Sequence, residues 1–138
     1  MIKVGFYIKN EGNIYMITKI KNIKNAINEE LEYLNFNFDH TGTKYLIDAI
    51  YLLYCQEIFY KFSLESQVYP IIANKYGDTA SAIKGAIEYA TDKMYYECDE
   101  EILREYIEDE EYWGKKNQNF KPGPKKIIRA VLRNIKDM

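Results

Sequence analysis

The fold of this chain is decided by the stretch Gln67-Val-Tyr-Pro-Ile-Ile-Ala-Asn-Lys-Tyr-Gly-Asp-Thr-Ala-Ser-Ala-Ile-Lys-Gly-Ala-Ile-Glu-Tyr-Ala-Thr91, which predicts two helices joined by a sharp turn. In the first helix, Ile71, Ile72 and Tyr76 form an apolar face. Gly77 then ends this helix, because a residue without a Cβ suits the left-handed conformation of a tight C-terminal turn.

The second helix is predicted to begin at Asp78 or Thr79, whose side-chain oxygens can accept hydrogen bonds from the free amides of its first turn. Its inner face recurs at helical spacing and consists of Ile83, Ala86, Ile87 and Ala90. Its outer face is short and polar and consists of Thr79, Ser81, Lys84, Gly85 and Glu88. This pattern is typical of a helix-turn-helix that reads DNA, and an ordinary helical hairpin is the alternative.

The rest of the chain is predicted to be mainly helical, which gives a domain of five or six helices that contains the helix-turn-helix. Its further helices are expected at 22–34, 44–62, 99–113 and from Pro124 onward. Residues 2–8 and 14–20 are rich in β-branched and aromatic residues and predict a small β-hairpin, although 14–34 also fits one long helical stripe. We therefore divide the chain into an N-terminal appendage, 1–22, and a helical domain, 23–138.

The composition is that of a soluble globular protein of one domain: 138 residues, 47% hydrophobic and 29% charged. The longest apolar run, 49–55, is too short to cross a bilayer, and no secretory signal opens the chain, so a cytoplasmic location is expected. Cys55 and Cys98 are interpreted as reduced thiols, with Cys55 in the core of its helix. With one histidine and no metal-binding or phosphate-binding motif, the sequence predicts no metal ion, no cofactor and no enzymatic activity.

Charge is distributed unevenly, although the net charge is only −2. Residues 97–111 hold nine acidic residues and one basic residue, whereas 114–138 hold eight basic residues and one acidic residue. We interpret the acidic run as a solvated helix face. The basic residues can pair with it or contact DNA phosphates, and phosphate contact is predicted for Lys121, Lys125 and Lys126.

Three stretches of the sequence resemble the C-terminal DNA-binding effector domain of stage 0 sporulation protein A, the response regulator that starts endospore formation. They are Gly42-Thr-Lys-Tyr-Leu-Ile-Asp-Ala-Ile50, then Val68-Tyr-Pro-Ile-Ile-Ala-Asn-Lys-Tyr76 with Thr79-Ala-Ser81 and Ala86-Ile87, and finally Lys121-Pro122. The resemblance runs from about residue 23 to the C-terminus. It implies a helical DNA-binding domain, and it covers no receiver domain, for which residues 1–22 are too few.

The sequence differs from the family in the helix that the family uses to read DNA. The family carries Arg, Glu and Arg at the positions of Ala82, Lys84 and Gly85, and a further basic residue at Glu88. Arginine makes the bidentate contact to guanine that specifies a base, and neither alanine nor glycine can replace it. The protein therefore either recognises a different DNA sequence through Ser81 and Lys84, or has a helix-turn-helix fold but lacks the side chains that contact bases.

Two functions follow from these observations. The first is a transcriptional regulator that docks residues 79–91 in the major groove of double-stranded DNA. The alternative is a protein-interaction module with weak or no DNA binding, whose partner is a sporulation regulator, a sigma factor of RNA polymerase or a second copy of the chain.

Overall fold

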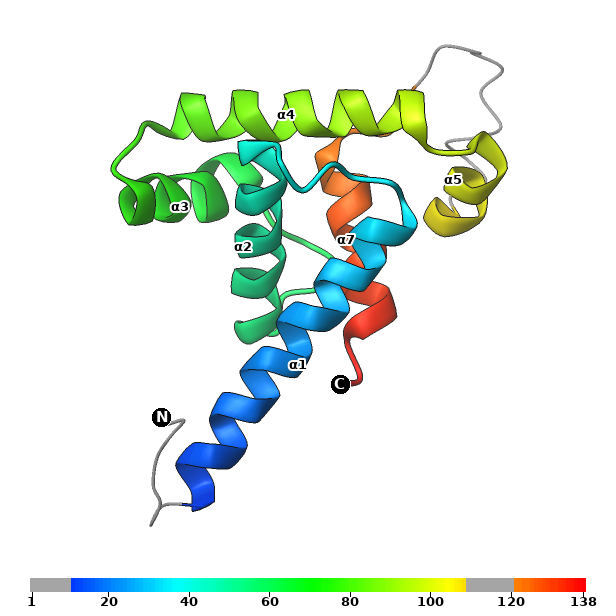
Figure 1. Cartoon of the computed structure of the whole chain (residues 1–138). Helices are drawn as coiled ribbons and strands as arrows, with labels where there is room; N and C mark the ends of the chain where they lie inside the picture. Colours follow the sequence, from blue (N-terminus) through cyan, green and yellow to red (C-terminus); the bar gives the residue numbers. More distant parts are fainter. Residues whose placement is uncertain (1–10, 109–120) are drawn as a thin grey trace.

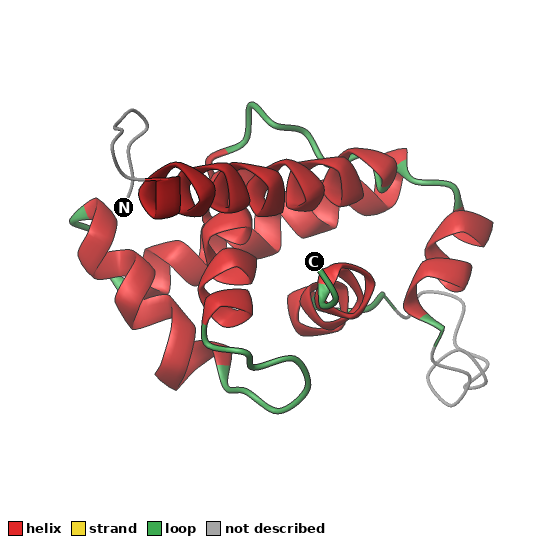
Figure 2. Ribbon diagram, turned by 90° about the horizontal axis from the view of Figure 1, so that it is seen from below, coloured by secondary structure: helices red, strands yellow, loops and turns green. Residues whose placement is uncertain are grey.

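A computed structural model describes residues 11–108 and 121–138, which form helices and connecting loops without any strand (Figures 1 and 2). The elements are α1 (Glu11–Tyr33), α2 (Thr41–Cys55), a short π-helical segment η1 (Leu64–Val68), α3 (Tyr69–Tyr76), α4 (Ala80–Glu97), α5 (Glu100–Ile107) and α7 (Pro124–Ile135). Helix α2 packs against α1, η1, α3, α4 and α7, and so occupies the centre. The predicted fold class, a mainly helical domain with a helix-turn-helix, is confirmed.

The core is built from the apolar stripes of α1, α2, α4 and α7. Its largest fully buried side chains are Ile27, Leu31, Leu34, Leu46, Ile50, Leu53, Ile83, Ile87, Met94, Ile127, Ile128 and Leu132. Each stripe recurs at the three- and four-residue spacing of a helix, so these four helices are held mainly by burial of one face. In the last helix, whose start at Pro124 was predicted, the apolar residues at this spacing are buried: Ile127, Ile128, Val131, Leu132 and Ile135.

Helix α1 is longer than the hairpin interpretation allowed. Residues 14–20, predicted as the second strand, belong to this helix, so the hairpin prediction is wrong, while its first strand, 2–8, lies outside the described residues. The alternative of one long helix is correct for 14–33, and of its predicted apolar stripe Ile23, Ile27 and Leu31 are buried, whereas Ile20 is 38% exposed. The helix passes through position 22 without a break, and the division of the chain there stays a prediction.

Helix α2 ends at Cys55 and not near residue 62 as predicted. Glu57 adopts a left-handed conformation with φ of 58°, and the Ile58 amide donates to the Leu53 carbonyl at 2.9 Å. This is the hydrogen bond of a helix-ending turn, but glutamate gives no sequence signal for it. Cys55, the last residue of the helix, is exposed, and its assignment to the core is wrong.

Gly42 lets α2 reach the backbone of α4. A Cβ placed on Gly42 would lie 1.8 Å from the carbonyl oxygen of Ala86 and 3.0 Å from the Cβ of Ala90. Only hydrogen fits at such a distance, so the first turn of α2 packs directly against the backbone of α4. This contact fixes the position of α4 against the centre of the domain.

The last described helices are joined to α1 by hydrogen bonds that involve Tyr106. Its hydroxyl donates to the Glu30 carboxylate at 2.6 Å, and Asn134 donates to the same carboxylate oxygen at 3.0 Å. Burial and the Glu30 carboxylate raise the pKa of Tyr106, so the hydroxyl stays protonated and remains a donor. The Arg133 guanidinium donates to the Tyr106 carbonyl at 2.6 Å. These bonds tie α5 and α7 to α1.

Candidate nucleic-acid interface

The helix-turn-helix is formed by α3 and α4, and its turn has the predicted chemistry. Gly77 is left-handed, with φ of 66°, and the Asp78 amide donates to the Ala73 carbonyl at 2.9 Å. The Thr79 hydroxyl accepts from the Ala82 amide at 3.0 Å and so caps α4. Pro70 lies in the first turn of α3, where its missing N–H costs nothing.

We expect Thr79→Ala to lower the free energy of unfolding by about 1 kcal/mol, because it removes this cap from the first turn of α4. Urea unfolding followed by circular dichroism measures the change. Thr79→Ser is the matched control, since serine keeps a hydroxyl that can accept the same hydrogen bond. Equal losses in the two variants would contradict a role for the cap.

The apolar face predicted for α3 is only partly correct. Ile72 is buried, whereas Ile71 is 49% exposed and Tyr76 is 41% exposed. The Tyr76 ring packs on Tyr45 with ring centroids 4.9 Å apart, and its hydroxyl donates to the Asp48 carboxylate. Because α3 has only two turns, a single row of its side chains reaches the core.

Helix α4 turns one face into the core and leaves the other open. Ile83, Ile87, Ala90 and Met94 are buried on the inner face. On the outer face of its first three turns, Thr79, Ser81, Ala82, Gly85 and Glu88 are exposed. The acidic helix α5 lies beyond the opposite, C-terminal end of α4 and does not cover this face (Figure 1). The structure thus brings these predicted site residues together on one open surface.

Lys84, the cation predicted to contact DNA, is held by a carboxylate that the sequence interpretation did not identify. Its Nζ lies 2.7 Å from Oε2 of Glu65, which η1 places beside α4. Hydrogen bonding to Glu65 raises the pKa of Lys84, and hydrogen bonding to Lys84 lowers the pKa of Glu65. Both side chains are exposed, so the pair adds little to stability. To reach a phosphate, Lys84 must leave Glu65.

The exposed part of α4 and its neighbour η1 carry no excess of positive charge. Glu88 and Asp92 on α4 and Glu65 on η1 stand against Lys84 and Lys93. Burial, and then the negative charges of Glu88 and Glu65, raise the pKa of the nearby Tyr69 to about 12. The surface has the shape of a DNA-reading face but lacks the excess of positive charge that usually accompanies one.

The three lysines predicted to contact phosphates lie in different places. Lys121 lies beside the second half of α4, with its Nζ 4.3 Å from the ring centroid of Tyr96. Together with Gly85 and Glu88 it lines a groove of about 380 Å³ between α4 and the start of α7. Lys125 extends over the Phe62 ring, and Lys126 faces a separate groove on α7. Of the three, only Lys121 extends the surface of α4.

Two tyrosines of α4 were not identified by the sequence interpretation. Tyr89 and Tyr96 are 55% and 74% exposed, and lie two turns apart on the helix. The Nζ of Lys93 lies 5.3 Å from the Tyr89 ring centroid, and Lys121 lies over Tyr96. The seven-residue spacing of two tyrosines on a polar helix face was the available signal. Exposed aromatic rings of this kind are enriched in protein interfaces.

Within residues 11–108 and 121–138, no group of histidine, cysteine or acidic side chains is arranged to hold a metal ion. None of the helices in these two ranges combines the length and the apolar character that crossing a membrane requires.

The fold and the open face of α4 define a helix-turn-helix domain of the DNA-binding class. Residues 27–135 match the family described as Sporulation initiation factor Spo0A C terminal, and the chain belongs to this family. The family is one of DNA-binding effector domains that regulate transcription in sporulation, and not a family of enzymes. No curated protein matches the sequence at a significant level.

Proposed function

We propose that the protein is a sequence-specific transcriptional regulator that places the first three turns of α4 in the major groove of DNA. The observation that supports this most directly is the open outer face of α4, on which Thr79, Ser81, Ala82, Gly85 and Glu88 are all exposed. A helix in this position of a helix-turn-helix presents its first turns to base edges. Small residues at Ala82 and Gly85 let the helix backbone approach a groove closely.

Base reading in this proposal depends on Ser81 and on Lys84 after it exchanges Glu65 for DNA. Serine can contact either purine or pyrimidine edges, and lysine can donate to guanine O6 and N7. Lys121, on the flank of α4, supplies a phosphate contact that positions the domain without reading sequence.

Selection of bound fragments from a genomic DNA library, followed by fluorescence anisotropy at two salt concentrations, tests the proposal. We expect an enriched sequence motif that binds more tightly than random duplex, with affinity that falls as salt rises. Failure to enrich any sequence at low salt would exclude a regulator that reads DNA by itself.

For Lys84→Ala, we expect about a tenfold loss of affinity for the enriched site, about 1.4 kcal/mol, since the main cation of the reading face is removed. Lys93→Ala, which removes the same charge from an exposed position about two and a half turns further along α4, is the matched control. If both variants lost the same affinity for DNA, Lys84 would contribute only through its charge and not through a direct contact.

A protein-interaction module with weak DNA binding is the second function, and the Lys84–Glu65 pair together with Glu88 favours it. In that case the same open face of α4 meets a protein, either a sporulation regulator, a sigma factor or a second copy. Light scattering of the purified protein alone and with each partner measures this directly. A monomer that joins none of them would remove the support for this function.

A further inference from the structure

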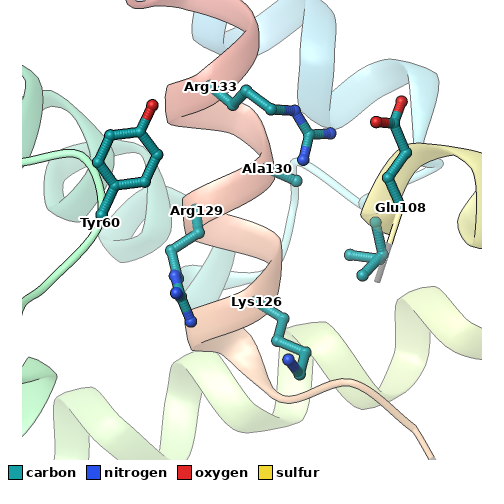
Figure 3. Close-up of a pocket in the computed structure, with 7 residues that line it drawn as sticks. Tyr60, Glu108, Lys126, Arg129, Ala130 and Arg133 are labelled. Atoms are coloured by element: carbon teal, nitrogen blue, oxygen red, sulfur yellow. The ribbon is translucent and has the colours of Figure 1, made fainter. Parts of the chain in front are cut away.

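A second surface of interest is a groove along α7 that lies apart from the face of α4. It is lined by Tyr60, Ile107, Glu108, Lys126, Arg129, Ala130 and Arg133 and has a volume of about 270 Å³. None of these residues belongs to α4. Figure 3 shows α7 as the floor, with Tyr60 on one side and Glu108 on the other.

The floor of this groove carries cations at consecutive turns of one helix. Lys126, Arg129 and Arg133 follow one another at three- and four-residue spacing, so they span about 10 Å along α7. Ala130 lies between them, and its small side chain leaves the floor low (Figure 3). Arg129 and Arg133 lie four residues apart, and like charges at this spacing repel one another, so an anion bound between them would relieve an unfavourable arrangement.

The guanidinium groups are available to such an anion. Arg129 is exposed and makes no hydrogen bond or ion pair with any other residue that the structure describes. Arg133 donates to the Tyr106 carbonyl through one nitrogen, which fixes its direction while leaving further N–H donors. Guanidinium groups match the geometry of phosphate oxygens and bind them through paired hydrogen bonds.

The two walls indicate what else the ligand carries. The Tyr60 ring is 55% exposed, and Lys136 positions it by donating to its hydroxyl at 3.1 Å. An exposed ring held in this way can pack against the organic part of a ligand. The Glu108 carboxylate, on the opposite wall, would repel a bare polyanion and accept a hydrogen bond from a hydroxyl or amino group.

We propose that the α7 groove binds a small organic phosphate that carries hydrogen-bond donors of its own. The phosphate lies on Arg129, Lys126 and Arg133, the organic part packs on Tyr60, and a donor group faces Glu108. The volume, about 270 Å³, lies just below the range of small-molecule sites, about 300–1,000 Å³, and is far too small for a duplex. The groove therefore adds a ligand site to the domain, distinct from its proposed DNA face.

Isothermal titration calorimetry of the whole chain with adenosine diphosphate and with inorganic pyrophosphate tests the proposal at low salt. We expect both probes to bind, with adenosine diphosphate binding more tightly because only it reaches Tyr60 and Glu108. Arg129→Gln should weaken both probes about tenfold, whereas Tyr60→Ala should weaken only adenosine diphosphate. Lys125→Gln removes a cation from the neighbouring position of α7 outside the groove, and should leave both affinities unchanged.

Three results would overturn the proposal. The first is no heat with either probe at millimolar concentration. The second is an equal loss for Arg129→Gln and Lys125→Gln, which would show attraction by general charge. The third is that a hexaglutamate peptide binds as tightly as adenosine diphosphate, which would make the groove a site for acidic peptides. Circular dichroism of each variant confirms that it is folded, and the exposure of Arg129, Tyr60 and Lys125 favours this outcome.

Discussion

Replacing Gly42 by alanine is expected to lower the free energy of unfolding by about 3 kcal/mol. The added Cβ would lie 1.8 Å from a backbone oxygen of Ala86, and a backbone atom cannot move aside as the end of a flexible side chain can. Either α2 or α4 must shift, and both belong to the core, so the cost is at the upper end of that for overpacking. For a domain of this size we expect the melting temperature to fall by roughly 10 °C. Thermal and urea unfolding measure the two quantities.

Gly85→Ala is the matched control for this change. Both glycines lie inside helices, but a Cβ on Gly85 would meet nothing within 4 Å. Alanine has the higher helix propensity, so this variant is expected to be more stable by up to about 1 kcal/mol. If the two variants unfolded at the same urea concentration, the close crossing of α2 and α4 would be disproved.

Replacing Glu88 by arginine is expected to raise the affinity for DNA by about tenfold at low salt, about 1.4 kcal/mol. Glu88 is exposed on the outer face of α4, where it would oppose phosphates with the wrong sign. An arginine there adds one phosphate contact, so the slope of log affinity against log salt should become steeper by about one. Fluorescence anisotropy over a salt series measures both changes.

Glu101→Arg makes the same change of charge on α5, beyond the other end of α4, and is expected to leave DNA affinity nearly unchanged. An equal gain in both variants would indicate attraction by net charge alone. No gain from Glu88→Arg would mean that the outer face of α4 does not meet DNA, which is the result expected for the protein-interaction module.

Local patterns of the sequence were sufficient to predict the helix-turn-helix. Gly77 and Thr79 carry their own signals, since one permits a left-handed turn and the other supplies a capping oxygen. The stripe of Ile127, Val131 and Ile135 likewise predicted the buried face of α7. In each case the structure depends on residues within about one or two helical turns of one another, so the sequence is sufficient to predict it.

The ends of α2 and α5 could not be predicted in the same way. A glutamate in the left-handed conformation follows each helix: Glu57, with φ of 58°, lies two residues after α2, and Glu108, with φ of 53°, lies directly after α5. This conformation costs about 1–2 kcal/mol for a residue with a Cβ, and favourable contacts elsewhere in the fold must offset it. The helix predicted for 99–113 therefore ends at Ile107 in the described chain, and residues 109–113 lie outside the described residues.

The sequence by itself determined that the chain is mainly helical, where its helix-turn-helix lies, and which family it belongs to, because periodicity and turn chemistry are properties of neighbouring residues. Only the tertiary structure decided that Glu65 holds Lys84, that Gly42 meets the backbone of α4, and that Tyr60 and Glu108 face the cations of α7. These pairs are 18 to 73 positions apart in the chain. No local pattern encodes such a contact, since it exists only once the apolar faces of the helices have packed together.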